Sequence, residues 1–176
     1  MIDEGAAGED RPLVGIYLRA PADVLDGWIR HPPTVSAIEL HAWIRDGRAL
    51  DLGRAWEALG VFIDGGIRLP STGPTVGVTP LLPEAPDAAW ASVSPAETVA
   101  FAADLRRLGP GEFAARYAVD AEDSVEIPDS RTGGWGSQRQ YMFKKLEALK
   151  AHYAIAAAAG EGMLVRIGPR PRRPPA

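Results

Sequence analysis

The chain has 176 residues, of which 46% are hydrophobic and 24% charged, with a formal net charge of −4. This length suits one domain with a sizeable core, and the composition is that of a globular chain rather than a disordered one. The spread of acidic residues argues against a nucleic-acid-binding surface, and the lack of cysteine excludes disulfides and thiolate chemistry.

The chain begins with a polar, acidic segment, residues 1–12, which we expect to be a flexible leader. It lacks the basic and apolar regions of a signal peptide, and no run approaches the roughly 20 apolar residues that a membrane span needs. We therefore expect a cytoplasmic protein that does not contact membranes. The excess of arginine over lysine, with abundant alanine, glycine and proline, is typical of a GC-rich bacterial genome.

The first half of the domain predicts one strand and three helices. Residues 14–19 are apolar and partly β-branched, which favours a strand, and Pro21 opens a short helix through Trp28. Residues 38–44 fit no clear period and are assigned to a helix. Asp51 is interpreted as the N-cap of a third helix, whose apolar face has four-three-four spacing: Leu52, Trp56, Leu59 and Ile63. Residues 66–86, rich in proline, glycine and threonine, predict a long irregular excursion.

The second half predicts a strand at residues 90–93 followed directly by a helix. Ser94 and Glu97 form a capping-box pattern with Pro95 at the first helical position. That helix should turn Phe101, Leu105 and Leu108 inward, and a short helix should follow at residues 112–117. An acidic segment, 120–129, and a glycine-rich loop, 131–136, complete this part.

A long amphipathic helix and a short strand end the domain. One helix face carries Met142, Leu146, Leu149 and Tyr153, while Lys144, Lys145, Ala148 and His152 are expected to point elsewhere. Gly160 ends the helix, and residues 163–167 predict a strand that pairs with strands far upstream. We predict a single compact α/β domain, with α+β as the alternative, in which helices flank a small mixed sheet of three to four strands. It spans residues 13–168, and a disordered proline-arginine tail follows at 169–176.

Four blocks of the sequence resemble the bacterial YfbM-like family, also catalogued as the domain of unknown function DUF1877. They are residues 15–19 (GIYLR), 50–56 (LDLGRAW), 93–97 (VSPAE) and 141–167. The resemblance implies a single α/β domain without an established activity, so it carries over no catalytic residue. Relatives often have Asp, Lys and His where this chain has Gly53, Arg54 and Glu57, so any chemistry of that Asp or His is absent here.

Two places are candidate binding sites. Asp51, Arg54, Trp56 and Glu57 bring two carboxylates, a guanidinium and an indole within two helical turns, although capping and core packing explain the same residues. Trp135 lies between glycines, where an indole can close over a ligand or anchor a partner, or can fill the core.

Other motifs are weak. The acidic residues Glu122, Asp123, Glu126 and Asp129 match no calcium loop and are interpreted as a solvated connection. His31, His41 and His152 are too scattered for a local metal motif, and no nucleophile elbow or phosphate loop occurs. We expect no metal and no cofactor.

Two functions are left open. The first is a non-enzymatic binding domain that acts through residues 66–86, the Trp135 loop and the Trp56 helix, and that neutralises a basic protein partner by charge complementarity. The alternative is a small-ligand binder or enzyme whose site is assembled around Tyr17, Arg19, Asp51 and Glu57. A homodimer is compatible with either.

Overall fold

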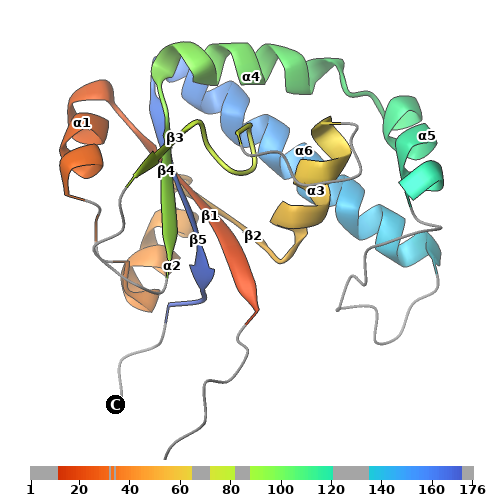
Figure 1. The fold of residues 1–176 in the computed structure, drawn as a ribbon, viewed down its shortest axis with the longest axis horizontal. Coiled ribbons are helices and arrows are strands. Elements are labelled where there is room, and N and C mark those ends of the chain that lie inside the picture. Colours follow the sequence, from red (N-terminus) through yellow and green to blue (C-terminus); the bar gives the residue numbers. More distant parts are fainter. Residues whose placement is uncertain are drawn as a thin grey trace, which may run out of the picture.

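A computed structural model describes residues 12–31, 33, 35–64, 72–81, 88–120 and 135–171. Within these residues five strands form one sheet: β1 (Leu13–Ala20), β2 (Ala49–Gly53), β3 (Thr79–Leu81), β4 (Ala89–Val93) and β5 (Gly162–Pro169). The helices are α1 (Ala22–Arg30), α2 (Ala37–Arg45), α3 (Ala55–Asp64), α4 (Pro95–Arg107), α5 (Pro110–Asp120) and α6 (Trp135–Ala159) (Figure 1).

The sheet has the order β2-β1-β5-β4-β3, and every pairing is antiparallel. The last strand lies at its centre, where it pairs with β1 from Leu13↔Pro169 to Ala20↔Gly162 and with β4 on its other side. The prediction that the terminal strand pairs far upstream is therefore confirmed, as is the single α/β domain. The sheet has five strands rather than three or four, and it is antiparallel rather than mixed.

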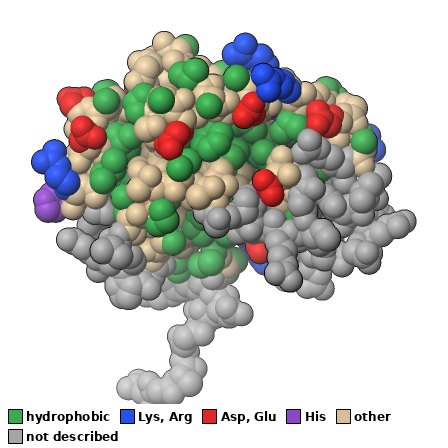
Figure 2. All heavy atoms as spheres, turned by 45° about the horizontal axis from the view of Figure 1, so that its top comes forward, with side chains coloured by type: hydrophobic (Ala, Val, Ile, Leu, Met, Phe, Trp, Pro, Cys, Tyr) green, Lys and Arg blue, Asp and Glu red, His purple; other side chains and the backbone are tan. Residues whose placement is uncertain are grey.

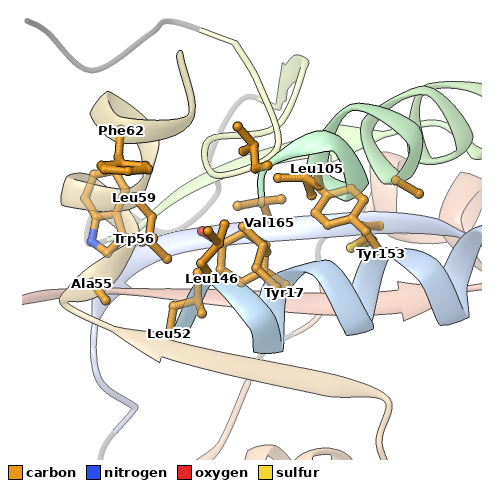
Figure 3. Close-up of a cluster of buried hydrophobic side chains, with 14 of the residues drawn as sticks. Tyr17, Leu52, Ala55, Trp56, Leu59, Phe62, Leu105, Leu146, Tyr153 and Val165 are labelled. Carbon is orange, nitrogen blue, oxygen red and sulfur yellow. The ribbon is translucent and has the colours of Figure 1, made fainter. Parts of the chain in front are cut away.

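The sheet separates two hydrophobic clusters because alternate residues of a strand face opposite sides. In β1, Ile16 and Leu18 face the smaller cluster beneath α1 and α2, whereas Tyr17 faces the larger cluster. The larger cluster is formed with α3, α4, α5 and α6, and α4 lies along α6 (Figure 1). Figure 3 shows Tyr17, Leu146 and Tyr153 pointing into this cluster.

The predicted inward face of α6 is confirmed, since Met142, Leu146, Leu149 and Tyr153 are all buried. His152 is also buried, with 6% of its surface exposed, so its assignment to the polar side was wrong. The helix packs both against α4 and against the sheet, so more than one stripe of its surface is covered.

Asp51 is not a helix N-cap, because it lies in the edge strand β2 opposite Ile16. Its carboxylate instead accepts a 2.7 Å hydrogen bond from the backbone amide of Gly53. Gly53 has φ +60°, which ends the strand, and α3 begins at Ala55. The four-three-four spacing of apolar residues that starts at Leu52 crosses a strand and a helix, and it fits a single helix only by chance. The prediction therefore missed strand β2.

Most other expected elements are confirmed. Ser94 and Glu97 form the expected capping box of α4, and a second capping box at Ser36 and Glu39 begins α2. The described part of the 66–86 excursion contains the short strand β3. Trp135 is the first residue of α6 rather than part of a loop. Residues 1–11 of the predicted leader, the segment 121–134 with its acidic cluster, and residues 172–176 of the predicted tail lie outside the described residues. Pro169, the first residue of the predicted tail, is the last residue of β5.

Candidate functional site

A cleft of about 370 Å³ opens between α3, α4, α5 and residues 72–75. This volume is at the lower end of the roughly 300–1,000 Å³ of small-ligand pockets. Apolar side chains form much of its lining: Ile63, Pro74, Phe101, Leu105 and Leu108. On the face where α4 comes forward, Figure 2 shows acidic side chains spaced around a stretch of hydrophobic ones.

Two buried tyrosines hold one wall of the cleft. The hydroxyl of Tyr17 donates a 2.7 Å hydrogen bond to the carbonyl of Thr75, and that of Tyr153 donates a 2.9 Å hydrogen bond to the carbonyl of Pro74. Burial raises the pKa of both phenols above their ordinary value, so both stay protonated donors. Residues 74–75 are therefore attached to the sheet and to α6 at once.

The same wall is shaped by a tight turn at residues 73–77. Gly73 and Gly77 exchange two backbone hydrogen bonds of 2.8 Å, and the amide of Val78 donates to the carbonyl of Ser92 in β4. Gly77 has φ +80°, and a Cβ there would lie 2.5 Å from the Cβ of Ala91. Only glycine fits this position, so the turn is fixed against the sheet.

The rim of the cleft carries most of its charge. Among the described lining residues, Asp64, Asp104 and Glu112 contribute carboxylates, against the single guanidinium of Arg107. Arg107 and Asp104 form an ion pair of 3.1 Å whose side chains are 79% and 68% exposed. An exposed pair of this kind is weak and exchanges readily. The cleft thus combines an apolar interior with a rim of negative charge.

Thr75 supplies an unsatisfied polar group to the wall. It is fully buried and borders the cleft, and its Oγ1 has no hydrogen-bond partner in the described structure. The same holds for Oγ1 of Thr98 and Nε2 of His152, but neither of these residues lines the cleft. A buried hydroxyl without a partner costs about 1–3 kcal/mol.

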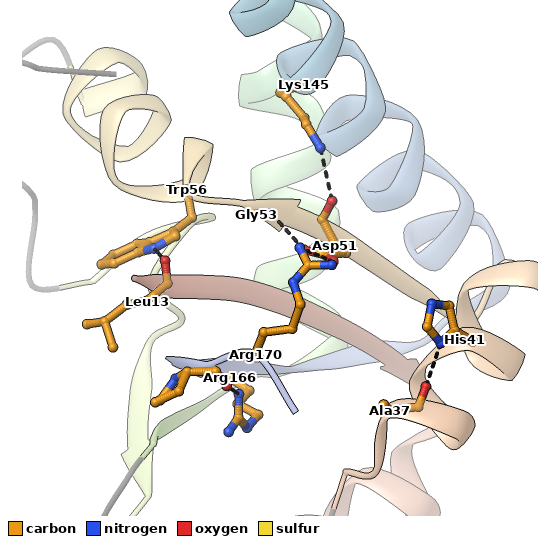
Figure 4. Close-up of polar contacts among 10 residues, drawn as sticks. Leu13, Ala37, His41, Asp51, Gly53, Trp56, Lys145, Arg166 and Arg170 are labelled. Carbon is orange, nitrogen blue, oxygen red and sulfur yellow. Dashed lines mark hydrogen bonds and ion pairs between the residues drawn. The ribbon is translucent and has the colours of Figure 1, made fainter. Parts of the chain in front are cut away.

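Of the residues predicted to form a site, the structure brings Tyr17 and Trp56 together. Both are buried in the larger cluster, and Trp56 packs over Gly15, where a Cβ would lie 2.6 Å from the Trp56 Cβ and 3.1 Å from the Tyr17 hydroxyl. The indole Nε1 of Trp56 donates a long hydrogen bond of 3.4 Å to the carbonyl of Leu13 (Figure 4). Neither side chain lines the cleft.

Asp51 has its own set of partners on β2. Its carboxylate forms a 2.8 Å ion pair with Arg170, and its carbonyl accepts a 3.2 Å hydrogen bond from Lys145 of α6 (Figure 4). These contacts explain Asp51 as a structural link between the edge strand, α6 and the end of β5.

Arg19 and Glu57 lie apart from Asp51. The guanidinium of Arg19 donates to the carbonyl of Gly47 and pairs with Glu161 at 3.2 Å, while Glu57 is exposed on α3. The side chain of Trp135 lies outside the described residues. No contact gathers Tyr17, Arg19, Asp51 and Glu57 within the described structure, and a binding role for any of them stays a prediction.

His152 is the buried titratable group that the sequence pattern misplaced. Burial, and then the positive charge of Arg19, lower its pKa from 6.5 to about 4, against a backbone hydrogen bond with Tyr17 that raises it. The imidazole is therefore neutral at neutral pH and packs as part of the interior. It takes no part in the cleft.

Sequence patterns missed the residues of the rim. Asp64, Asp104 and Glu112 come from three different helices, so no local spacing joins them. The sequence did point to two of the segments that line the cleft, residues 66–86 and the Trp56 helix, because an irregular excursion and an amphipathic helix suggested a surface.

Two other features, a metal site and a membrane-spanning helix, are absent from the described residues. No group of three or more His, Asp or Glu side chains there is arranged to hold a metal ion. None of the helices in that part of the chain has both the length and the apolar character needed to cross a membrane.

Comparison with known proteins places this fold in a family. The family described as "Domain of unknown function (DUF1877)" matches residues 13–166. The chain belongs to this family. The resemblance inferred from the four sequence blocks is therefore confirmed, and the leader and the tail lie outside the matched DUF1877 residues. No curated protein matches the chain.

A solved structure shares the DUF1877 fold: the crystal structure of a protein of unknown function, YfbM, from Escherichia coli. It superimposes with a TM-score of 0.60 at 16% sequence identity, covering 88% of this chain and 99% of the other. At this identity the likeness concerns the fold.

Proposed function

We propose that this DUF1877 domain is a non-enzymatic binding domain that holds a basic segment of a protein partner against the cleft between α3, α4 and α5. The observation that carries the proposal is the combination of an apolar cleft with three carboxylates and one guanidinium on its described lining. Charge complementarity of this kind steers a basic partner and fixes its orientation, while the apolar interior supplies affinity.

The placement of the charges favours binding over catalysis. Catalytic acids and bases are usually desolvated to match their pKa to the reaction. Here Asp64, Asp104 and Glu112 lie at exposed positions, where solvent and a partner can reach them. The alternative function, a ligand or catalytic site around Tyr17, Arg19, Asp51 and Glu57, has no comparable support, since these side chains make separate contacts.

The test measures the binding of a fluorescent oligoarginine peptide by anisotropy at low and at physiological salt. The cleft variant neutralises the rim and combines Asp64→Asn, Asp104→Asn and Glu112→Gln. Binding should weaken by about tenfold or more, because each carboxylate that faces a cation contributes up to about 1 kcal/mol.

A matched control changes the net charge by the same amount on the other face of the sheet. It combines Asp23→Asn, Asp26→Asn and Asp46→Asn, three exposed residues of α1 and the end of α2. The control should bind the peptide nearly as well as the wild type. Equal losses in both variants would mean that only the overall charge matters, and would overturn the proposed site.

A further inference from the structure

We infer that a second copy of this chain binds to the exposed side of α4 and of the C-terminal half of α6, with α4 of each copy against α6 of the other. This surface lies outside the cleft, so the inference does not rest on the proposed function. It follows from three properties of the surface: its apolar character, its charges at one end and its size.

The exposed sides of both helices are apolar. On α4, exposed residues at helical spacing form one stripe: Ala96, Val99, Ala100 and Ala103. On α6, exposed residues with the same spacing form another: Ala151, Ala154, Ile155 and Ala158. The two largest of these side chains, Val99 and Ile155, are each 53% exposed. We call the two stripes together the α4–α6 face.

The stripes form one surface because α4 and α6 lie side by side on the same face of the sheet (Figure 1). The helices run in opposite directions. Lys150 of α6 donates to the carbonyl of Leu108 at the end of α4, whereas Pro95 at the start of α4 lies beside Gly162, just after α6. Each stripe lies opposite the buried side of its helix, so both face away from the sheet.

The α4–α6 face suits a second copy better than an unrelated partner. Neither stripe contains a charged residue that would select a polar partner, and its alanines form no pocket for an anchoring side chain. Rows of small residues instead fit rows of the same kind, because helices approach to about 8 Å where the contacting side chains are small. An uncharged face also lets two chains of net charge −4 meet without like charges in contact.

The charges at one end of the face complement those of a second copy. Arg106, near the end of α4, and Glu147, on the adjacent part of α6, are both exposed. A two-fold axis along the groove between the helices sets α4 on α6 of the other copy, so each Arg106 meets a Glu147. Glu147 also holds Lys150 at 2.8 Å, but its side chain is 46% exposed and a carboxylate accepts several donors.

The helix dipoles favour the same arrangement. Because α4 and α6 are antiparallel, the two-fold axis places the N-terminus of each α4 against the C-terminus of an α6. The last turn of α6 carries no basic residue, so the negative end of its dipole is available to this contact.

The area of the face determines how tight the dimer is. Two adjacent helices with a length of about 20 Å present a footprint of about 400 Å². Exposed apolar patches of about this size mark interaction sites. Two copies with their charged rims would bury about 1,000–1,200 Å² in total, at the lower end for a specific interface. We therefore expect a reversible dimer that dissociates in the micromolar range.

Sedimentation velocity of the full chain tests the inference at concentrations from about 5 to 500 µM. The mass should rise with concentration from that of the 18.8 kDa monomer toward that of a dimer. A monomer throughout this range would overturn the inference.

The face variant combines Val99→Glu with Ile155→Glu. Association should weaken by about 100-fold or more, because each site occurs twice in a two-fold interface. The control, Ile29→Glu with Ile38→Glu, makes the same change of charge at exposed positions of α1 and α2 and should dimerise like the wild type. Circular dichroism checks that both variants keep their helices. Equal losses in the two variants would overturn the inference.

A charge exchange tests how the copies are arranged. Arg106→Glu alone and Glu147→Arg alone each set like charges opposite one another, so each should weaken association by about tenfold. An equimolar mixture of the two variants should dimerise like the wild type, since both contacts again join opposite charges. A mixture that associates no better than the single variants would overturn the placement of α4 against α6.

Discussion

The hydroxyl of Tyr17 lies 2.7 Å from the backbone carbonyl of Thr75, although 58 residues separate the two in the chain. Tyr17 comes from β1, next to the central strand, and Thr75 borders the cleft. The bond therefore connects the core to the wall of the proposed binding site. Tyr17 was predicted to belong to a site, and its contacts make it a positioning residue for the cleft.

The first prediction concerns the substitution Tyr17→Phe. It leaves the carbonyl of Thr75 buried without this donor, so the free energy of unfolding should fall by about 1–3 kcal/mol. Urea denaturation measures this loss. Amide exchange at residues 75–77 should quicken more than exchange in β5, because the turn loses one of its attachments.

The companion substitution Tyr153→Phe removes the bond to Pro74 and should act on the same turn. The loss in the free energy of unfolding of the double variant should differ from the sum of the losses of the two single variants, since both tyrosines restrain adjacent residues. Unchanged exchange at residues 75–77 in both single variants would show that the turn does not depend on these hydroxyls.

The second prediction is that Thr75→Val stabilises the protein. The substitution removes a buried hydroxyl without a partner, so the free energy of unfolding should rise by about 1 kcal/mol. Thermal or urea unfolding measures the gain. Thr98→Val provides the control, because its Oγ1 is also buried without a partner but lies outside the cleft. Both variants should be more stable, and a less stable Thr75→Val protein would contradict the conclusion that the Thr75 hydroxyl has no hydrogen-bond partner.

The third prediction concerns stability at acid pH. The pKa of His152 is about 4 in the folded protein against an ordinary value of 6.5, so the unfolded chain binds its proton more tightly. The contribution of His152 is therefore fully present above pH 6.5 and is lost as the pH falls toward 4. The loss should reach about 3 kcal/mol.

The variant His152→Leu separates this effect from other acid-dependent changes in the protein. Urea denaturation at several pH values should give a shallower acid slope for the variant than for the wild type. Parallel slopes for wild type and His152→Leu would refute the assigned pKa.

Sequence patterns predicted helices and strands correctly where a segment fitted only one local pattern. The capping box at Ser94 and the stripe along α6 are both local signals, and both are present. At Asp51 two patterns overlapped, because a helical spacing happened to continue through an edge strand. Pairing with β1 decides that segment, and pairing depends on residues far away in the sequence.

The cleft could not be predicted from local sequence patterns for a similar reason. Its rim draws Asp64, Asp104 and Glu112 from three helices, and their approach depends on how those helices pack. The lack of a hydrogen-bond partner for Oγ1 of Thr75 depends on packing in the folded interior, so no sequence motif predicts it. His152 illustrates the same point, since its burial arises from packing on two sides of α6.

The last prediction uses two glycines that differ in their surroundings. A Cβ on Gly162, at the start of the central strand, would lie 2.4 Å from Cδ2 of Leu25 and 2.6 Å from the carbonyl oxygen of Val93. Because the backbone at Val93 cannot yield easily, Gly162→Ala should destabilise the protein by about 1–3 kcal/mol. A Cβ on Gly27 in α1 would have no neighbouring atom within 4 Å among the described residues, so Gly27→Ala should stabilise the protein by about 0.5–1 kcal/mol through helix propensity. Thermal unfolding of the two variants should move the midpoint in opposite directions, and a shift in the same direction would contradict the packing of β5 against β4 and α1.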